Sequence, residues 1–354
     1  MPPIPKGGTV AVTGAAGFIG GWVVRRLLDK GYRVRACLRD SGDPVRTGFL
    51  EVMPGYASGR LTLHAANLDN AGCFDDIFKG CHGVAHVSHV SDYNDQDYVK
   101  MVCDHIIESV SASESVSRVI VTSSLAAVVS ERNLPEMVQR PVIYEDRYPD
   151  ENNPRVSGYS IAKVLAQRAF SDAAEKHGGW DAITCCPADN VGPIQSAHQK
   201  NGGPWQHLIE LMLLGECNPG VHGGRPWHTV DVRDTAECQI GLLESVQVEN
   251  GQRYLAYSAD RANLEDICTS IDRLLPELGY ATPDLSEDLD DEARQRREEV
   301  VATFWGTDLR NDRIRAVVPI RFRPLDESVR DCVESMLTVA NIKPVQRPGF
   351  SHRG

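Results

Sequence analysis

Short apolar runs alternate with segments of helical periodicity through the first 190 residues. Between the first two runs, Ile19, Val23 and Leu27 recur every four positions, which predicts a helix with one buried face. Strands that alternate with helices form parallel sheets covered on both faces, with right-handed crossovers. The pattern therefore predicts an α/β fold of Rossmann type, a doubly wound parallel sheet. Its strands are expected at 9–12, 33–38, 61–64, 83–89, 119–123 and 181–187.

The pattern loosens after residue 190. Gly and Pro cluster at 191–193, 201–204 and 223–226, which indicates loops. We expect an NADP-binding Rossmann domain over 1–190 that carries the catalytic residues. A smaller, mainly substrate-binding region should cover 191–342, with some return of the chain to the Rossmann sheet. A charged, solvated helix is expected over 287–303 and a loose tail over 343–354.

Glycine-rich sequence, Thr13-Gly-Ala-Ala-Gly-Phe-Ile-Gly20, follows the first predicted strand and opens the first helix. Gly14 permits a tight turn, Gly17 lets the backbone approach a pyrophosphate, and Gly20 lets the helix pack closely on the strand. The helix N-terminus adds free N–H groups and partial positive charge. This context predicts a dinucleotide site.

Arg39 identifies the expected dinucleotide. It lies 19 residues after Gly20 at the end of the second strand, where a guanidinium can hold the 2′-phosphate of NADPH through two hydrogen bonds. Arg46 is a second candidate contact. Asp40 would instead suit the ribose hydroxyl of NAD, but the two arginines favour NADPH/NADP⁺.

Tyr159 and Lys163 are four residues apart at the start of a predicted helix, so they share one face. A nearby cation lowers the pKa of a phenol, and we expect Lys163 and an oxidised nicotinamide to do so together. Ser123 and Ser124 end the fifth strand, where such folds bind ligands. These residues predict proton transfer to a carbonyl oxygen.

The chain resembles the extended short-chain dehydrogenase/reductase family, in the branch of dihydroflavonol reductases, cinnamoyl-CoA reductases and microbial aldehyde or ketone reductases. The resemblance covers about residues 8 to 330. It is carried by the segments 10–20, 31–35, 79–84, 118–124, 159–163, 187, 191–193 and 230–234.

By that resemblance Ser124, Tyr159 and Lys163 are the catalytic residues, and Ser124 rather than Ser123 is the catalytic serine. The expected cofactor contacts are Gly14, Ala16, Gly17, Phe18, Ile19, Gly20, Arg39, Arg46, Asn67, Leu68, Ser88, Pro187 and Val191. The expected substrate contacts are His89, Val129, Asn190, Trp205 and Trp227; for the two tryptophans, a place in the core of the smaller region is an equal alternative.

Several positions depart from the family pattern. Asn67 replaces an aspartate after the third strand, and Ser88-His89-Val90 replaces Ala-Ser/Thr-Pro after the fourth. Val129 stands where flavonoid reductases present a polar residue, which counts against a flavonol substrate. Asp189 and Asn190 are polar where relatives are often apolar, and the sequence offers no account of them.

Composition limits the partners. The formal net charge of −12 argues against nucleic acid or an anionic membrane as a binding partner. The sequence contains no run of about 18 apolar residues, which is the length that a membrane span needs. The absence of a leader before the first strand suggests a cytoplasmic protein, monomer or homodimer, with reduced thiols. Cys185 and Cys186 should point to opposite faces of a strand. His82, His86 and His89 lie along one strand and should not converge on a metal.

The prediction is therefore an NADPH-dependent carbonyl reductase acting on a small or medium organic aldehyde or ketone. One alternative is a nucleotide-sugar epimerase or dehydratase, although the dehydratase Thr-Asp-Glu is replaced here by Ser124-Leu125-Ala126. A second is a catalytically silent NADP-binding regulator, which the intact Ser124, Tyr159 and Lys163 argue against.

Overall fold

A seven-stranded sheet in the order β10-β7-β5-β4-β1-β2-β3 forms the centre of the molecule. The computed structural model describes residues 1–129, 142–143, 145–154, 156–216, 227–258, 261–262, 264–274, 290–292, 294–295, 298 and 308–345. Each adjacent pair of strands is parallel, so the predicted fold class is confirmed. The strands are β1 (Thr9–Thr13), β2 (Arg33–Leu38), β3 (Leu61–Ala65), β4 (Gly83–His86), β5 (Arg118–Thr122), β7 (Asp181–Pro187) and β10 (Arg253–Ala256).

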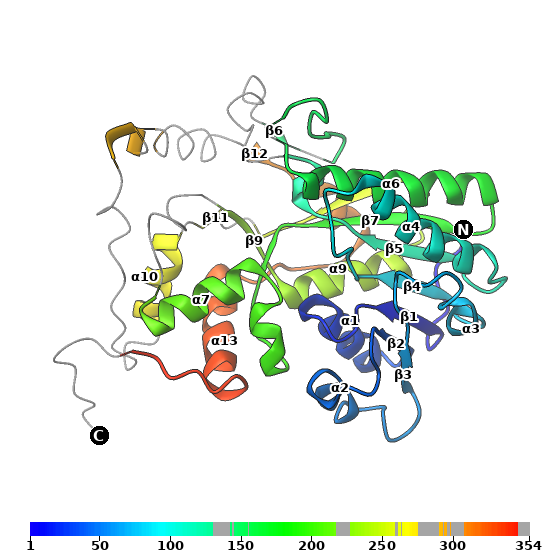
Figure 1. Ribbon diagram of the computed structural model, residues 1–354, viewed down its shortest axis with the longest axis horizontal. Coiled ribbons are helices and arrows are strands. Elements are labelled where there is room, and N and C mark those ends of the chain that lie inside the picture. Colours follow the sequence, from blue (N-terminus) through cyan, green and yellow to red (C-terminus); the bar gives the residue numbers. More distant parts are fainter. Residues whose placement is uncertain are drawn as a thin grey trace.

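Helices cover both faces of the sheet (Figure 1). On one face lie α1 (Phe18–Asp29) and α9 (Val232–Glu244); on the other lie α3 (Asp75–Phe78), α4 (Gln96–Ser111) and α6 (Gly158–His177). Side chains of a strand alternate between these two cores. Val10 and Val12 of β1 belong to the α1/α9 core and Ala11 to the α4/α6 core. Two-sided burial explains why the strands read as continuous apolar runs.

The sheet order reverses at β1, whose neighbours are β2 and β4. Such a switch point opens a crevice at the carboxyl ends of the strands. Gly14 follows β1 in the left-handed region, with φ +66°, and a Cβ there would lie 2.9 Å from the backbone of Ser88, which follows β4. Glycine is therefore required where the two strand ends meet. Helix α2 (Pro44–Glu51) follows β2.

A second group of elements forms a smaller region beside the carboxyl ends of the strands (Figure 1). Strands β8 (Asp189–Val191), β9 (Trp227–Asp231) and β11 (Arg261–Ala262) form a three-stranded sheet. Helices α7 (Pro204–Leu214), α10 (Leu264–Leu274) and α13 (Leu325–Thr338) share a third apolar core. The short elements are η1 (Leu125–Ala127), β6 (Val142–Ile143), η3 (Ala197–Asn201), β12 (Asp308–Leu309) and α12 (Asp312–Val317).

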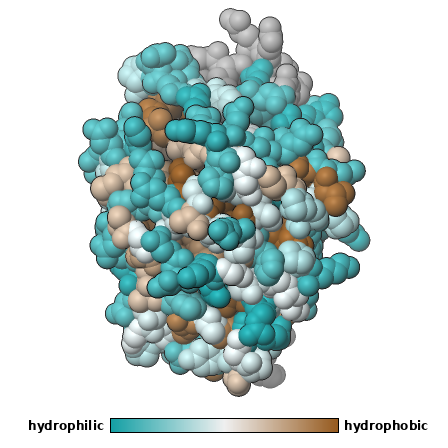
Figure 2. Space-filling model, turned by 90° about the vertical axis from the view of Figure 1, so that its right-hand side faces the viewer, coloured by the Kyte–Doolittle hydropathy of each residue, from teal (hydrophilic) through white to brown (hydrophobic). Residues whose placement is uncertain are grey.

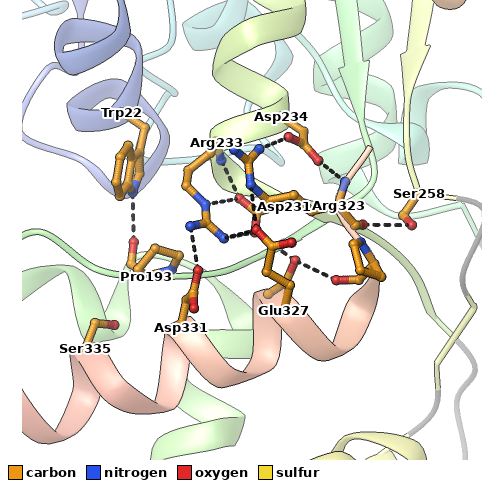
Figure 3. A network of polar contacts seen from close by, with 12 residues as sticks. Trp22, Pro193, Asp231, Arg233, Asp234, Ser258, Arg323, Glu327, Asp331 and Ser335 are labelled. Carbon is orange, nitrogen blue, oxygen red and sulfur yellow. Dashed lines mark hydrogen bonds and ion pairs between the residues drawn. The ribbon is translucent and has the colours of Figure 1, made fainter. Parts of the chain in front are cut away.

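A polar network joins the smaller region to the sheet (Figure 3). Arg233, at the start of α9, donates to Asp231 at 2.8 and 2.9 Å and to Asp331 of α13 at 2.5 Å. The backbone N–H of Arg323 donates to Asp234 at 2.6 Å. Nearby, the indole N–H of Trp22 in α1 donates to the carbonyl of Pro193 at 2.8 Å. Ion pairs and hydrogen bonds thus fix α13 against α9.

The face shown in Figure 2 is mostly hydrophilic, with hydrophobic side chains in small separate patches. No helix among the described residues has the length and apolar character needed to cross a membrane. Cys185 and Cys186 are both free and buried. Cys185 lies in the α1/α9 core and Cys186 in a separate apolar cluster, so the prediction that their side chains point to opposite faces of the strand is confirmed. The predicted helix over 287–303 falls mostly outside the described residues, as do residues 346–354 of the predicted tail.

Candidate active site

A cavity of about 470 Å³ opens at the carboxyl ends of the sheet strands. Ser124, Tyr159 and Lys163 all line it, together with Phe18 and Ile19 from the first turn of α1. Its opposite wall comes from the smaller region, through residues 188–190 and 202–203. The fold therefore brings the predicted catalytic residues beside the end of the glycine-rich loop, as expected at a topological switch point.

Local hydrogen bonds position each of the three predicted catalytic side chains. Ser124 follows β5 and caps η1, since its Oγ accepts a hydrogen bond from the N–H of Ala126 at 3.1 Å. Ser157 caps α6 and accepts from the N–H of Ser160 at 3.2 Å. Tyr159 and Lys163 thus occupy the first two turns of α6, on one face. The bond at Ser124 leaves its own hydroxyl hydrogen available to another acceptor.

The electrostatics of the tyrosine differ from the expected lowering of its pKa. In the protein itself burial raises the pKa of Tyr159, and Asp189 raises it further, while a hydrogen bond with Ser124 lowers it. The Lys163 ammonium donates to the carbonyl of Thr122 at 3.1 Å and lies 5.6 Å from the centre of the Tyr159 ring. Burial lowers the pKa of Lys163 to about 8. Because desolvation raises the pKa of Tyr159 above its ordinary value, the side chain is a protonated phenol at neutral pH.

The glycine-rich loop has the form that a pyrophosphate requires. No side chain caps α1, and no acidic residue lies in its first turn. A Cβ on Gly17 would lie 3.2 Å from the carbonyl of Gly14, and one on Gly20 would collide with the same group. The hydroxyl of Thr13 joins this loop to the end of β4, accepting from the N–H and the hydroxyl of Ser88 at 3.2 and 2.7 Å. The free N–H groups of α1 can therefore face an anion.

The end of β2 suits an additional phosphate. Arg39 is exposed there and makes no hydrogen bond or ion pair with the described residues. Asp40, the residue that would favour NAD, instead accepts from the N–H of Gly42 at 2.8 Å. Arg46 is also exposed and lies 3.6 Å from Asp43, which caps α2. Asn67 and Leu68 follow β3 at the same edge. The residues present fit a dinucleotide with a 2′-phosphate.

Comparison with known proteins agrees with this geometry. Residues 10–256 match the model of the NAD dependent epimerase/dehydratase family. The chain belongs to this family. The predicted resemblance to extended short-chain dehydrogenases/reductases, which are NAD(P)-dependent oxidoreductases, is thereby confirmed.

Curated relatives include a dihydroflavonol 4-reductase of Callistephus chinensis, 32% identical over 296 residues, which are 80% of this chain and 77% of the relative. A cinnamoyl-CoA reductase of Medicago truncatula is 35% identical over 250 residues, 68% of this chain and 73% of the relative. Among solved structures, Gre2 from Candida albicans has a TM-score of 0.75 and 22% identity, covering 94% of this chain and 99% of that chain. The last comparison supports the fold.

Within this family framework, the predicted substrate residues separate into two groups. Val129, His89 and Asn190 line the cavity. The Asn190 side chain is already engaged by the protein: its amide donates to the carbonyl of Ala188 at 3.1 Å, and its oxygen accepts from Thr235 at 2.6 Å. It therefore shapes the wall through backbone and helix contacts.

Trp205 and Val191 do not line the cavity. Both are buried in the apolar core of the smaller region, so of the two alternatives for Trp205 the structure shows the core. Large aromatic side chains favour that place because they bury the most apolar surface. Trp227 begins β9. Among the predicted cofactor contacts, Pro187 does line the cavity, and Ala16 is a buried residue of the glycine-rich loop itself.

Two residues that line the cavity, Tyr93 and Asp189, were not among the site residues predicted from the sequence. The Tyr93 ring lies edge-on to the Tyr159 ring, with centroids 4.8 Å apart, and the His89 ring stacks on Tyr93 at 5.8 Å. Tyr93 belongs to the loop between β4 and α4, where no periodicity marks a side chain as inward. Asp189 was visible only as an unusual polar residue; it lies on β8 and faces the cavity.

The histidines around β4 have separate partners. His82 accepts from the N–H of Thr9 at 3.1 Å, and His86 shares a hydrogen bond of 2.9 Å with Thr13. Burial lowers the pKa of His86 to about 3. Within the described ranges, no three His, Cys, Asp or Glu side chains are grouped as a metal site would require.

Proposed function

We propose that this chain is an NADPH-dependent reductase of small or medium organic aldehydes or ketones, with Tyr159 as the proton donor. The observation that carries the proposal is the meeting of Ser124, Tyr159 and Lys163 in one cavity beside the N-terminus of α1. We include in the proposal a cytoplasmic monomer or homodimer with no nucleic-acid partner.

The choice of NADPH rests on the charged groups at the end of β2. Arg39 is an exposed guanidinium, and Asp40 is turned to the backbone of Gly42. The structural neighbour Gre2 from Candida albicans has been solved in complex with NADPH. When bound, NADPH supplies the hydride for the carbonyl carbon. Gly14, Gly17 and Gly20 would hold its pyrophosphate, and Arg39 its 2′-phosphate.

The protein's own residues handle the proton. Because the pKa of Tyr159 is raised, its hydroxyl carries a proton at neutral pH and can donate it to the carbonyl oxygen. Ser124 accepts from Ala126 and can donate its own hydrogen to the same oxygen, so it orients the substrate. Lys163 brings positive charge beneath the Tyr159 ring, which compensates the phenolate left after donation.

The cavity wall favours a substrate of moderate size. Tyr93 and His89 form an aromatic side next to Tyr159, and buried Val129 closes another side. Such surfaces suit an aryl or alkyl carbonyl compound better than a nucleotide sugar, whose diphosphate would need cationic groups. Lys163 is the sole Lys or Arg that lines the described cavity.

The test is an assay of NADPH consumption with matched aliphatic and aromatic aldehydes and ketones, each repeated with NADH. We expect several of them to be reduced, faster with NADPH. The purified protein is also denatured and its supernatant analysed for dinucleotide. Tightly held NAD together with no reduction of any carbonyl would refute the proposal and favour an epimerase. Binding of NADPH without turnover would favour a regulator.

A further inference from the structure

The helix η3 of the smaller region lies against the outer side of the glycine-rich loop. Gln199 donates from its amide to the carbonyls of Ala16 and Gly17, at 3.2 and 3.1 Å. The ring Nε2 of His198 lies 2.8 Å from the same Ala16 carbonyl. Gln199 is 1% exposed. These contacts join positions more than 180 residues apart in the chain.

Peptide geometry gives the Gln199 contact a consequence at the ligand side. The carbonyl of Gly17 and the N–H of Phe18 belong to one planar trans peptide and point in opposite directions. The Gly17 carbonyl also accepts the first hydrogen bond of α1, from Gly21 at 2.9 Å. The Gln199 amide and the Gly21 N–H therefore fix the plane of this peptide, and with it the direction of the Phe18 N–H. Phe18 is one of the residues that line the cavity.

Gln199 is itself held in one orientation. Its side-chain oxygen accepts from the N–H of Gln195 at 2.8 Å, which leaves the amide nitrogen for the loop. Its approach depends on a glycine: a Cβ on Gly21 would lie 3.1 Å from the Gln199 amide nitrogen. Gly202 likewise packs on Phe18, since a Cβ there would lie 2.8 Å from the Phe18 Cβ. These two glycines allow the η3 segment to pack closely against the glycine-rich loop.

We propose that Gln199 is a positioning residue for the dinucleotide, which orients the glycine-rich loop toward the pyrophosphate from the substrate-side region of the chain. The inference rests on the proposed NADPH function. If Gln199 has this role, the smaller region supplies part of the affinity for the cofactor, although the glycine-rich loop itself belongs to the β1–α1 unit. His198 supports the same loop through Ala16.

The experiment compares Gln199→Met with Gln195→Met by measuring Kd from ligand-induced fluorescence change. Methionine keeps the side-chain length but cannot donate. Gln195 is the matched control because its amide nitrogen has no partner within the described residues. The probes are NADPH and adenosine 2′-monophosphate, which has the 2′-phosphate but no pyrophosphate. For Gln199→Met, which loses the amide donor to the Ala16 and Gly17 carbonyls, we expect the NADPH Kd to rise about tenfold.

The Kd of adenosine 2′-monophosphate should stay within about twofold, and Gln195→Met should match wild type for both probes. An unchanged NADPH Kd, or an equal rise for the two probes, would overturn the positioning role. If Gln199→Met does not fold, His198→Phe is the second variant. The His198 ring lies 5.8 Å from the Phe49 ring, and phenylalanine keeps that ring contact but removes the nitrogen beside Ala16. It should raise only the NADPH Kd, by about threefold, and the absence of such a rise would overturn the inference. A wild type that binds neither probe would instead refute the proposed function.

Discussion

The two walls of the cavity are built by different kinds of structure. Ser124, Tyr159 and Lys163 come from the end of a buried strand and the first turns of a 20-residue helix. Asp189 and Asn190 come from a three-residue strand, and Gly202 and Gly203 from the loop before α7. Rigid, repeated strand–helix units hold the groups that would move a proton, whereas short irregular elements shape the space for a substrate. Substitutions in the first wall should therefore affect turnover, and those in the second should affect selectivity.

Tyr159→Phe should have the largest effect. Phenylalanine keeps the ring against Tyr93 but removes the hydroxyl, so turnover should fall about 10³-fold, as for loss of a general acid. The NADPH Kd should stay within about twofold of wild type, because the proposed contacts that hold the phosphates, the glycine-rich loop and Arg39, are unchanged. Steady-state kinetics and fluorescence titration measure the two quantities. Turnover close to wild type would show that Tyr159 is not the donor.

Arg39→Ala should follow in size. Loss of the charge-assisted hydrogen bonds to the 2′-phosphate should raise the NADPH Kd about 30-fold while the NADH Kd changes little. Arg46→Ala is the control at a neighbouring exposed position paired with Asp43, and it should have a smaller effect. Equal changes for the two dinucleotides at Arg39 would contradict the choice of NADPH.

The pH dependence tests the lysine. Burial lowers the pKa of Lys163 to about 8, so its ammonium is present below that pH and loses its proton above it. Turnover should then fall about tenfold per pH unit above the pKa, because the positive charge beneath Tyr159 disappears. In Lys163→Arg the guanidinium stays charged, and any remaining activity should lack this falling limb. A wild-type profile that is flat between about pH 7 and about pH 9 would contradict the role of Lys163.

Asp189→Asn should have the smallest effect on rate and a visible effect on preference. The carboxylate raises the pKa of Tyr159, so its removal should lower that pKa and change turnover only about threefold. The ratio of kcat/KM for a negatively charged over a neutral carbonyl substrate should rise, since a like charge leaves the cavity. If turnover instead fell as in Tyr159→Phe, the division between the two walls would be wrong.

Much of the fold and part of the site could be predicted from local sequence. The strands buried on both faces read as apolar runs, and Gly14, Arg39 and Ser124 are recognisable because they follow such strands at fixed positions. Parallel strands bring their carboxyl ends together without further information. The i, i+4 spacing of Tyr159 and Lys163 required only a helix.

The rest depended on contacts that no local pattern encodes. Trp205 could serve a pocket or a core equally, and only packing decides. Tyr93 lies in a loop, and Gln199 meets the glycine-rich loop from 182 residues away. The raised pKa of Tyr159 follows from its burial, which the sequence does not give.

The pairing of β10 with β7 has a consequence for synthesis of the protein. β10 ends at residue 256 and forms the edge of the central sheet, and α9 just before it covers the same core as α1. A nascent chain that has emerged only to residue 190 therefore carries the glycine-rich loop, Ser124, Tyr159 and Lys163, yet its β7 edge is unpaired and the part of the sheet face that α9 covers is bare. Such an intermediate invites association with other chains. The ribosome must deliver about a quarter of the polypeptide beyond Lys163 before that hazard ends.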